Sequence, residues 1–256
     1  MIQGVLLDLS GVIYDADQAL PGAMRAVDRL RAAGLPLRFV TNTTSKPKRD
    51  LLERVRGFGI GVEDQEMFTP AQAACDWLKA HRRSPHLLIH PDLQPDFAGL
   101  PDYPDQAVVL GDAGRFFTYE ALNGAFRALI AGADFLALAN NRTFKDSDGE
   151  LSLDAGAFVA ALQYATRSEP IVLGKPSVDF FGAALASMDC PAASAVMVGD
   201  DAEMDVAGAL TAGIGHGLLV RTGKYRAGHE DAVQPAPTAV VDDITKAADW
   251  IIDRQA

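Results

Sequence analysis

Residues 5–14 read VLLDLSGVIY, an apolar run that carries a single carboxylate, Asp8. A short apolar run that ends in polar residues and a glycine is typical of a buried β-strand. We therefore expect a strand over residues 4–9 with Asp8 at its carboxyl end. A charge at that point needs a reason, because an unpaired carboxylate is costly to bury.

The rest of the chain alternates short apolar runs with amphipathic helical stretches. Further strands are expected at residues 37–41, 170–173, 195–198, 217–220 and 238–241. Helices are expected at residues 21–33, 70–81, 176–188, 202–212 and 244–252, and one more begins with Ser45 as its N-cap. This alternation predicts an α/β fold, in which a doubly wound parallel sheet is covered by helices on both faces.

The sequence pattern changes in the middle of the chain. Residues 84–170 contain a Pro-rich passage, strands expected at 86–90, 107–110 and 135–139, and a helix that carries Leu122 and Phe126. A hairpin turn is expected at KDSDGE, residues 145–150. We interpret this segment as a smaller α/β domain, residues 84–170, inserted into a core of residues 1–83 and 171–256.

Composition narrows the function. The 256 residues include 23 Lys and Arg against 34 Asp and Glu, a formal net charge of −11. That balance weighs against nucleic acid or an anionic membrane as partner. Cys75 and Cys190 are too few for a disulfide framework, and no apolar segment is long enough to span a membrane. Without a basic leader, the sequence predicts a cytoplasmic protein.

Polar clusters follow three of the predicted strands. They are Asp8, Thr41 with Asn42, and the run Gly199-Asp200-Asp201. The carboxyl ends of parallel strands line one edge of a doubly wound sheet, where ligands bind. One acid at a strand end is often only a cap or turn residue. Three clusters at the edge of one sheet indicate a functional site.

These residue types suit phosphoryl transfer. Asp8 can attack phosphorus as a nucleophile and form an acyl phosphate that water then cleaves. A cation is needed between the carboxylate and a dianionic phosphate, and Mg²⁺ prefers oxygen ligands of this kind. Asp8 and Asp200 would supply carboxylates, Ser10 its backbone carbonyl, and Asp205 a contact to a metal-bound water.

Other residues are candidates for binding the phosphate. Thr41 offers a hydroxyl, and the amides of Asn42 and Thr43 after it can form an anion-binding nest. Lys175, in the sequence GKPS after another strand, can supply positive charge to the phosphate oxygens and serve catalysis. A solvated surface lysine is the alternative at that position.

The four motifs together resemble a known family. DLSGV at Asp8, TN at Thr41, GKP at Lys175 and GDD at Asp200 are similar, in order and spacing, to the motifs of haloacid dehalogenase-like hydrolases. The resemblance covers essentially the whole chain. It implies a Rossmann-like core, an inserted cap of class IIA, Mg²⁺ dependence, an aspartyl-phosphate intermediate, a small phosphorylated substrate and a possible homodimer.

One position departs from the family pattern. Most phosphatases of this superfamily carry a second aspartate two residues after the nucleophile, as general acid and base, where this chain has Ser10. A serine hydroxyl is a poor proton donor at neutral pH. We therefore expect substrates whose leaving group needs no proton from the enzyme, such as pyrophosphate or a phosphoramidate whose nitrogen is already protonated (phosphohistidine or phospholysine), in preference to sugar phosphates.

Two other functions remain open from the sequence: a metal-independent dehalogenase, and a non-enzymatic protein that binds a phosphorylated ligand. Two further segments have uncertain roles. Residues 140–142, Asn-Asn-Arg, either contact the leaving group or form a plain polar turn. RTGKY, residues 221–225, shares residue types with a nucleotide-binding loop but lacks the spacing of that motif.

Overall fold

The computed structural model describes residues 1–145 and 150–255. Their contacts group into two compact units. The first unit comprises Met1–Thr41, Leu52–Phe68 and Lys175–Ala256, and the second comprises Asn42–Leu51 and Thr69–Gly174. Each unit is described by itself below.

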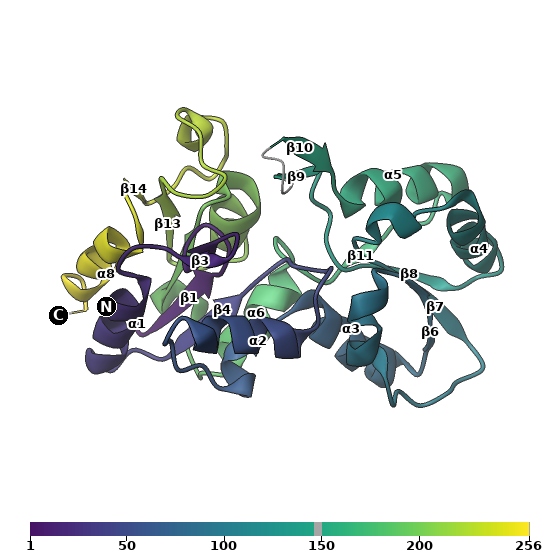
Figure 1. The fold of residues 1–256 in the computed structure, drawn as a ribbon, viewed down its shortest axis with the longest axis horizontal. Helices are drawn as coiled ribbons and strands as arrows, with labels where there is room; N and C mark the ends of the chain where they lie inside the picture. The colour runs from purple at the N-terminus through teal and green to yellow at the C-terminus, as the bar shows by residue number, and fades with distance from the viewer. Residues whose placement is uncertain (146–149, 256) are drawn as a thin grey trace. The chain divides into compact units, whose positions relative to one another are not determined.

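A six-stranded sheet forms the centre of the first unit (Figure 1), and all its strands are parallel. Its order is β14-β13-β12-β1-β4-β5. The strands are β1 (Gly4–Asp8), β4 (Leu37–Val40), β5 (Met67–Phe68), β12 (Ala195–Gly199), β13 (His216–Val220) and β14 (Ala239–Val241). The strand order reverses between β1 and β12, which is where a doubly wound sheet binds its ligands.

The sequence of β1 explains its central place. All five of its residues are buried, as expected for a parallel strand covered on both faces. Among the described residues, four α-helices lie wholly within this unit: α1 (Ala23–Ala32), α6 (Val178–Ala186), α7 (Gly208–Thr211) and α8 (Ile244–Ile252). α1 and α8 pack against each other, and both chain termini lie beside them in Figure 1. The expected doubly wound, Rossmann-like core is confirmed.

The helix expected over residues 202–212 is divided. Ala202–Ala207 form a π-helical segment, η5, and α7 follows it. In η5 the backbone N–H of Val206 donates to the Asp201 carbonyl, five residues earlier. The Asp201 carboxylate caps this segment by accepting from the N–H groups of Glu203 and Met204, at 3.1 and 3.0 Å. π-helical turns of this kind often occur at functional sites.

Helix α2 (Lys48–Gly57) begins later than the sequence indicates. Ser45 was expected to be its N-cap, but the first turn opens at Lys48, directly after Pro47. The N–H of Lys48 donates to the carboxylate of Asp96 at 3.0 Å. An acid distant in sequence therefore satisfies the helix start, so the expectation for Ser45 is wrong.

The second unit contains a four-stranded parallel sheet of order β11-β8-β7-β6. Its strands are β6 (Ser84–Leu88), β7 (Gln106–Leu110), β8 (Asp134–Ala137) and β11 (Ile171–Val172). The strand expected at residues 170–173 therefore pairs with β8, and the expectation that it joins the first sheet is wrong. A two-residue apolar strand fits either sheet, so its pattern does not specify a partner.

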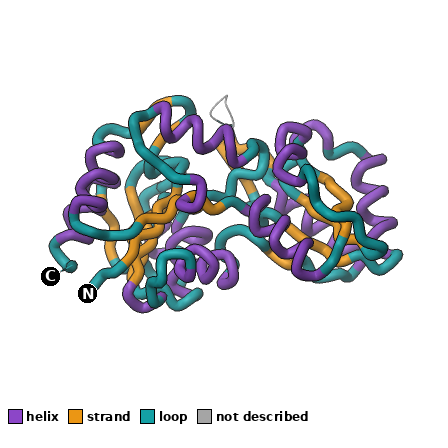
Figure 2. Tube along the Cα trace, turned by 90° about the horizontal axis from the view of Figure 1, so that it is seen from below, coloured by secondary structure: helices purple, strands orange, loops and turns teal. Residues whose placement is uncertain are grey.

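The helices of the second unit pack against both faces of its sheet, and alternate side chains of β7 contact helices on opposite faces. Val108 and Leu110 pack with α4 (Tyr119–Ile130) and α5 (Ala155–Thr166), whereas Ala107 and Val109 pack with α3 (Pro70–His81). Successive side chains of a strand point to opposite faces, so one strand contributes to both cores. In Figure 2 the strands of each unit, drawn in orange, lie between purple helices.

The remaining elements are short. Antiparallel hairpins are formed by β2 (Tyr14–Asp15) with β3 (Gln18–Ala19), and by β9 (Thr143–Lys145) with β10 (Leu151–Leu153). The turn expected at residues 145–150 lies largely outside the described residues. 3₁₀ turns cover Asp64–Glu66, Pro91–Phe97, Gly114–Phe116, Ala192–Ser194 and His229–Asp231. Within the described ranges, no helix is both long and apolar enough to cross a bilayer.

Candidate active site

Asp8 is the last residue of β1 and is only 6% exposed. The chain then turns sharply: Gly11 has φ of +80°, and its N–H donates to the Tyr14 carbonyl at 2.7 Å. A glycine suits this turn because residues with a Cβ rarely adopt a positive φ. Ser10, within the turn, is exposed and forms an isolated bridge with Tyr14.

Asp200 follows β12, the neighbour of β1. Leu7 pairs with Val198 in this parallel register, so the two strands end at nearly the same level. Asp8, Asp200 and Asp205 each offer a carboxylate oxygen, and these oxygens lie within 4.8 Å of one another. All three residues are buried. The short distances between their oxygens show that the predicted acids meet at one point of the sheet edge.

Lys175 connects two of these acids. Its Nζ donates to Asp8 Oδ1 at 2.5 Å and to Asp205 Oδ1 at 2.6 Å, and Lys175 is only 2% exposed. The surface-lysine alternative is therefore excluded. The other oxygen of Asp205 accepts from the N–H of Asp201 at 3.1 Å. Asp205 thus holds Lys175, a contact that the sequence did not indicate.

The charges of the site do not balance. Burial raises the pKa of Asp200 well above its ordinary range, and the charges of Asp8 and Asp205 raise it further. Burial also raises the pKa of Asp205 to about 6, although Lys175 opposes that rise. For Lys175, burial alone would lower the pKa, but Asp205 and Asp8 raise it above its usual value. An excess of buried negative charge suits a divalent cation.

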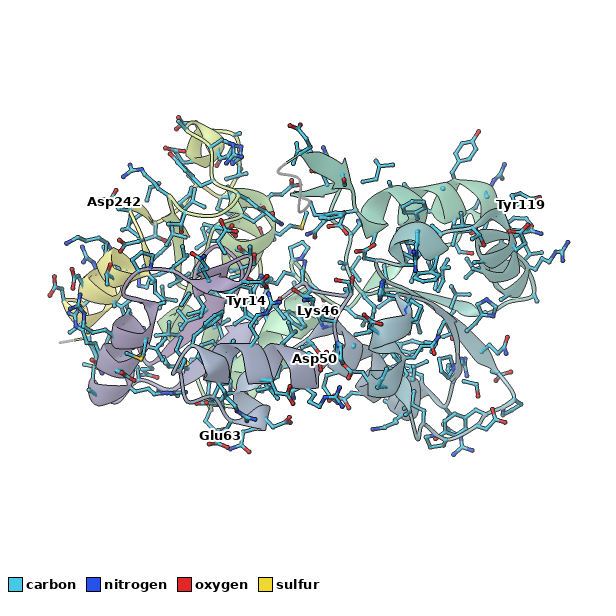
Figure 3. All side chains as sticks on the ribbon, viewed as in Figure 1. Tyr14, Lys46, Asp50, Glu63, Tyr119 and Asp242 are labelled. Atoms are coloured by element: carbon cyan, nitrogen blue, oxygen red, sulfur yellow. The ribbon has the colours of Figure 1, made fainter. Side chains whose placement is uncertain are left out.

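Tyr14, labelled in Figure 3, is a further buried ionisable residue of the first unit. Its ring lies 5.8 Å from that of Phe58, and the Arg54 guanidinium lies 5.4 Å from its centre. Burial and then the charge of Asp8 raise its pKa to about 12. The Tyr14 phenol therefore stays neutral at physiological pH.

The predicted phosphate-binding residues divide between the two units. Thr41 is 2% exposed and directly follows β4, where Val40 pairs with Asp8. Asn42 and Thr43 belong to the second unit. There the side-chain amide of Asn42 donates to Asn141 Oδ1 at 3.2 Å. The first unit therefore contains the predicted site residues Asp8, Thr41, Lys175 and Asp200.

The loop at residues 140–142 is partly internal. Asn141 is 8% exposed, its Oδ1 accepts from Asn42, and its backbone carbonyl accepts from the N–H of Gly156 at 3.0 Å. Asn140 and Arg142 are exposed. Contact with a leaving group remains a prediction for these two, while Asn141 has a contact of its own.

The RTGKY segment approaches the site, which the sequence did not indicate. The backbone N–H of Lys224 donates to Asp200 Oδ2 at 2.7 Å. A signal was present, because the segment directly follows the strand expected at residues 217–220. The rule that located Asp8 and Asp200 applies equally to this strand end. Lack of a nucleotide-binding pattern excluded one function for the segment but did not exclude others.

A buried carboxylate cluster with a lysine lies at the reversal point of a parallel sheet, the position at which doubly wound α/β proteins bind their ligands. Comparisons with known proteins identify the family. A family model described as haloacid dehalogenase-like hydrolase matches residues 5–97, and one described as HAD-hydrolase-like matches residues 172–247.

Relatives match along nearly the whole chain. The Rattus norvegicus protein named haloacid dehalogenase-like hydrolase domain-containing protein 2 is 43% identical over 252 residues, 98% of this chain and 96% of the relative. The Danio rerio phospholysine phosphohistidine inorganic pyrophosphate phosphatase is 40% identical over 257 residues, 98% and 94% of the two chains. The structure of a 4-nitrophenylphosphatase from Thermotoga maritima has a TM-score of 0.88 at 27% identity, covering 98% and 97%.

The chain belongs to the haloacid dehalogenase-like hydrolase family, as its motifs predicted. It is an enzyme of the phosphatase branch of that family. Membership in this family weighs against the alternative of a non-enzymatic protein that binds a phosphorylated ligand.

Proposed function

We propose that this enzyme is a Mg²⁺-dependent phosphatase that forms an aspartyl-phosphate on Asp8. The observation that supports this most is the cluster of three buried carboxylates, with oxygens within 4.8 Å, beside the ammonium of Lys175. The names of the relatives, which include a pyrophosphate phosphatase and a 4-nitrophenylphosphatase, agree with this class.

The donor set fits the proposed cation. Carboxylate and carbonyl oxygens suit Mg²⁺, and this cluster has more negative charge than Lys175 offsets. Asp8 and Asp200 would hold the ion with carboxylate oxygens, and Ser10 with its backbone carbonyl. When bound, Mg²⁺ would offset the negative charge of the phosphate and of the nucleophile.

The residues of the chain then have distinct tasks. A carboxylate oxygen of Asp8 attacks phosphorus, the bond to the leaving group breaks, and the phosphoryl group is attached to Asp8. Water cleaves this acyl phosphate and releases inorganic phosphate. Lys175 orients Asp8 and supplies positive charge to the phosphoryl oxygens, and Asp205 holds Lys175 in place. Thr41, Asn42 and Thr43 are proposed to bind the phosphate.

Ser10 bears on the choice of substrate. General acid–base catalysis typically contributes about 10²–10⁴-fold, and an exposed serine cannot supply it. Pyrophosphate, and a phosphoramidate whose nitrogen is already protonated, have leaving groups that depart without that help. We therefore propose substrates of these two kinds, in agreement with the printed name of the Danio rerio relative.

The domain assignment also stays a proposal. Residues 84–170 would form the cap and select the substrate, and residues 1–83 with 171–256 would form the catalytic core. A cytoplasmic location and a homodimer remain predictions.

The decisive test is Mg²⁺-dependent turnover of p-nitrophenyl phosphate by wild type and Asp8→Asn. We expect turnover only with Mg²⁺ and none above background in Asp8→Asn, because an amide is a poor nucleophile. Asp28→Asn makes the same chemical change on the exposed surface of α1 and serves as control. Wild-type turnover in Asp8→Asn would disprove the assignment.

A substrate panel tests the specificity. Pyrophosphate, phosphohistidine and phospholysine should be cleaved with higher kcat/KM than sugar or nucleotide monoesters. Equal or higher values for the monoesters would contradict the interpretation of Ser10.

A further inference from the structure

Two backbone segments enclose the carboxylate of Asp200. One contains Gly11, after β1, and the other contains Gly223, after β13. A Cβ atom at either glycine would overlap Asp200 Oδ2. Both glycines have positive φ, +80° and +61°, so each position excludes a side chain on two grounds. The carboxylate therefore lies against backbone on two sides.

Specific hydrogen bonds hold this enclosure together. The N–H of Lys224 donates to Asp200 Oδ2 at 2.7 Å, and the Thr222 hydroxyl donates to the backbone carbonyl of Gly11. The sheet explains the proximity, because β13 is paired with β12 and Leu219 lies level with Gly199. The turn after β13 thus emerges beside the residue that follows β12.

The approach is specific to this turn. Gly213 and Gly228, in the same unit, also have positive φ, +87° and +91°, but a Cβ at either would meet nothing within 4 Å. A turn alone therefore does not require contact with a carboxylate. The side chain of Lys224 adds charge at the same place, with Nζ 3.6 Å from Asp201 Oδ2.

We infer that Thr222, Gly223 and Lys224 are positioning residues that fix the orientation of the Asp200 carboxylate for a divalent cation. This inference rests on the proposed function. One N–H occupies a lone pair of Oδ2, and the two glycine backbones stop the carboxylate from rotating away. Partners of this kind orient a metal ligand, and their loss typically weakens metal affinity about 10–100-fold.

The test compares Gly223→Ala with Gly228→Ala. Both place a methyl group at a positive-φ position, but only the first places it against Asp200. Calorimetric titration with Mg²⁺ should give a dissociation constant about 10–100-fold higher for Gly223→Ala and unchanged for Gly228→Ala. The kcat of Gly223→Ala should recover in part at high Mg²⁺, which a general loss of structure would not allow.

A second pair of variants covers the case in which Gly223→Ala does not fold. Thr222→Val removes the hydroxyl that contacts Gly11 and keeps the side-chain shape, while Thr222→Ser keeps the hydroxyl. We expect Thr222→Val to raise the Mg²⁺ dissociation constant about tenfold and Thr222→Ser to restore most of the affinity. Equal affinity in Thr222→Val and wild type would overturn the inference.

The outcomes separate this inference from the proposed function. If wild type binds no Mg²⁺, or if Asp200→Asn binds it as tightly as wild type, the proposed metal site is wrong. If wild type binds Mg²⁺ and Asp200→Asn does not, while Gly223→Ala matches Gly228→Ala, only the positioning role is overturned.

Discussion

Lys175 depends on two carboxylates at once, since its ammonium contacts both Asp8 and Asp205. Lys175 and Asp205 form a buried ion pair. Removing one partner leaves the other charge buried without compensation, which typically lowers the free energy of unfolding by about 3–5 kcal/mol. The effects of Lys175→Gln and Asp205→Asn on the free energy of unfolding should therefore not add. We expect the double mutant to be more stable than the sum predicts, by about 1–3 kcal/mol in a double-mutant cycle.

An exposed pair provides the control for that cycle. Lys246 and Asp249 lie 3.4 Å apart with side chains 61% and 41% exposed. Their coupling should be below about 1 kcal/mol. A Lys175–Asp205 coupling as small as this one would show that the buried contact contributes little to stability.

Ser10 leads to a prediction about substrates. Ser10→Asp introduces a carboxyl group that can donate a proton to an alkoxide leaving group, whereas Ser10→Asn has nearly the same shape and cannot. We expect Ser10→Asp to raise kcat on an alkyl phosphate at least about tenfold, because acid catalysis typically supplies about 10²–10⁴-fold. No gain, or an equal gain in Ser10→Asn, would contradict the proposed consequence of the serine.

At the scale of elements, helix α3 provides a test of burial. Cys75 is 4% exposed on the face of α3 that packs against the second sheet. Burial raises the pKa of its thiol from 9.0 to about 11. The thiolate is the reactive form, and at pH 7.5 fewer than about one Cys75 in a thousand is ionised. A Cys190→Ser variant should therefore react with a thiol reagent very slowly when native and rapidly in urea.

Fast stoichiometric modification of that native variant would contradict the packing of α3. The same pKa shift affects stability. Because the raised pKa belongs to the folded state, the unfolded thiol loses its proton first as the pH rises. The contribution of Cys75 to stability is therefore complete below pH 9 and declines between pH 9 and about 11.

The elements also show what the sequence could and could not predict. Strand ends located Asp8 and Asp200 because topology alone brings parallel strand ends together. The same reasoning misplaced β11, whose two residues carry no information about their partner strand. The start of α2 was missed because its hydrogen-bond partner, Asp96, is distant in sequence. The contact between Lys175 and Asp205 depends on side-chain packing, which periodicity does not reveal.

At the scale of the whole molecule, the two tryptophans report on different units. Trp250 lies in α8 of the first unit and Trp77 in α3 of the second. If the cation binds to Asp8 and Asp200, it should stabilise the first unit directly. At a Mg²⁺ concentration 100 times its dissociation constant, we expect about 2.7 kcal/mol of added stability in the Trp250 signal.

Single-tryptophan variants make that measurement. Trp77→Phe leaves the Trp250 signal, and Trp250→Phe leaves the Trp77 signal. Urea unfolding followed by fluorescence should show a larger Mg²⁺-dependent shift in midpoint for Trp250 than for Trp77. A larger shift for Trp77 would indicate that the cation binds in the second unit, which would contradict the proposed site.

The polypeptide passes between the two units at four peptide bonds, of which the first joins Thr41 to Asn42 and the last joins Gly174 to Lys175. At this first and this last junction, one peptide bond joins a residue of the second unit to a residue with a proposed part in the chemistry. The main chain on one side of Thr41 and of Lys175 therefore belongs to the second unit, although both residues are assigned to the first. A substitution at Asn42 or Gly174 that changes the main-chain conformation there would therefore reach these two residues through a single covalent link.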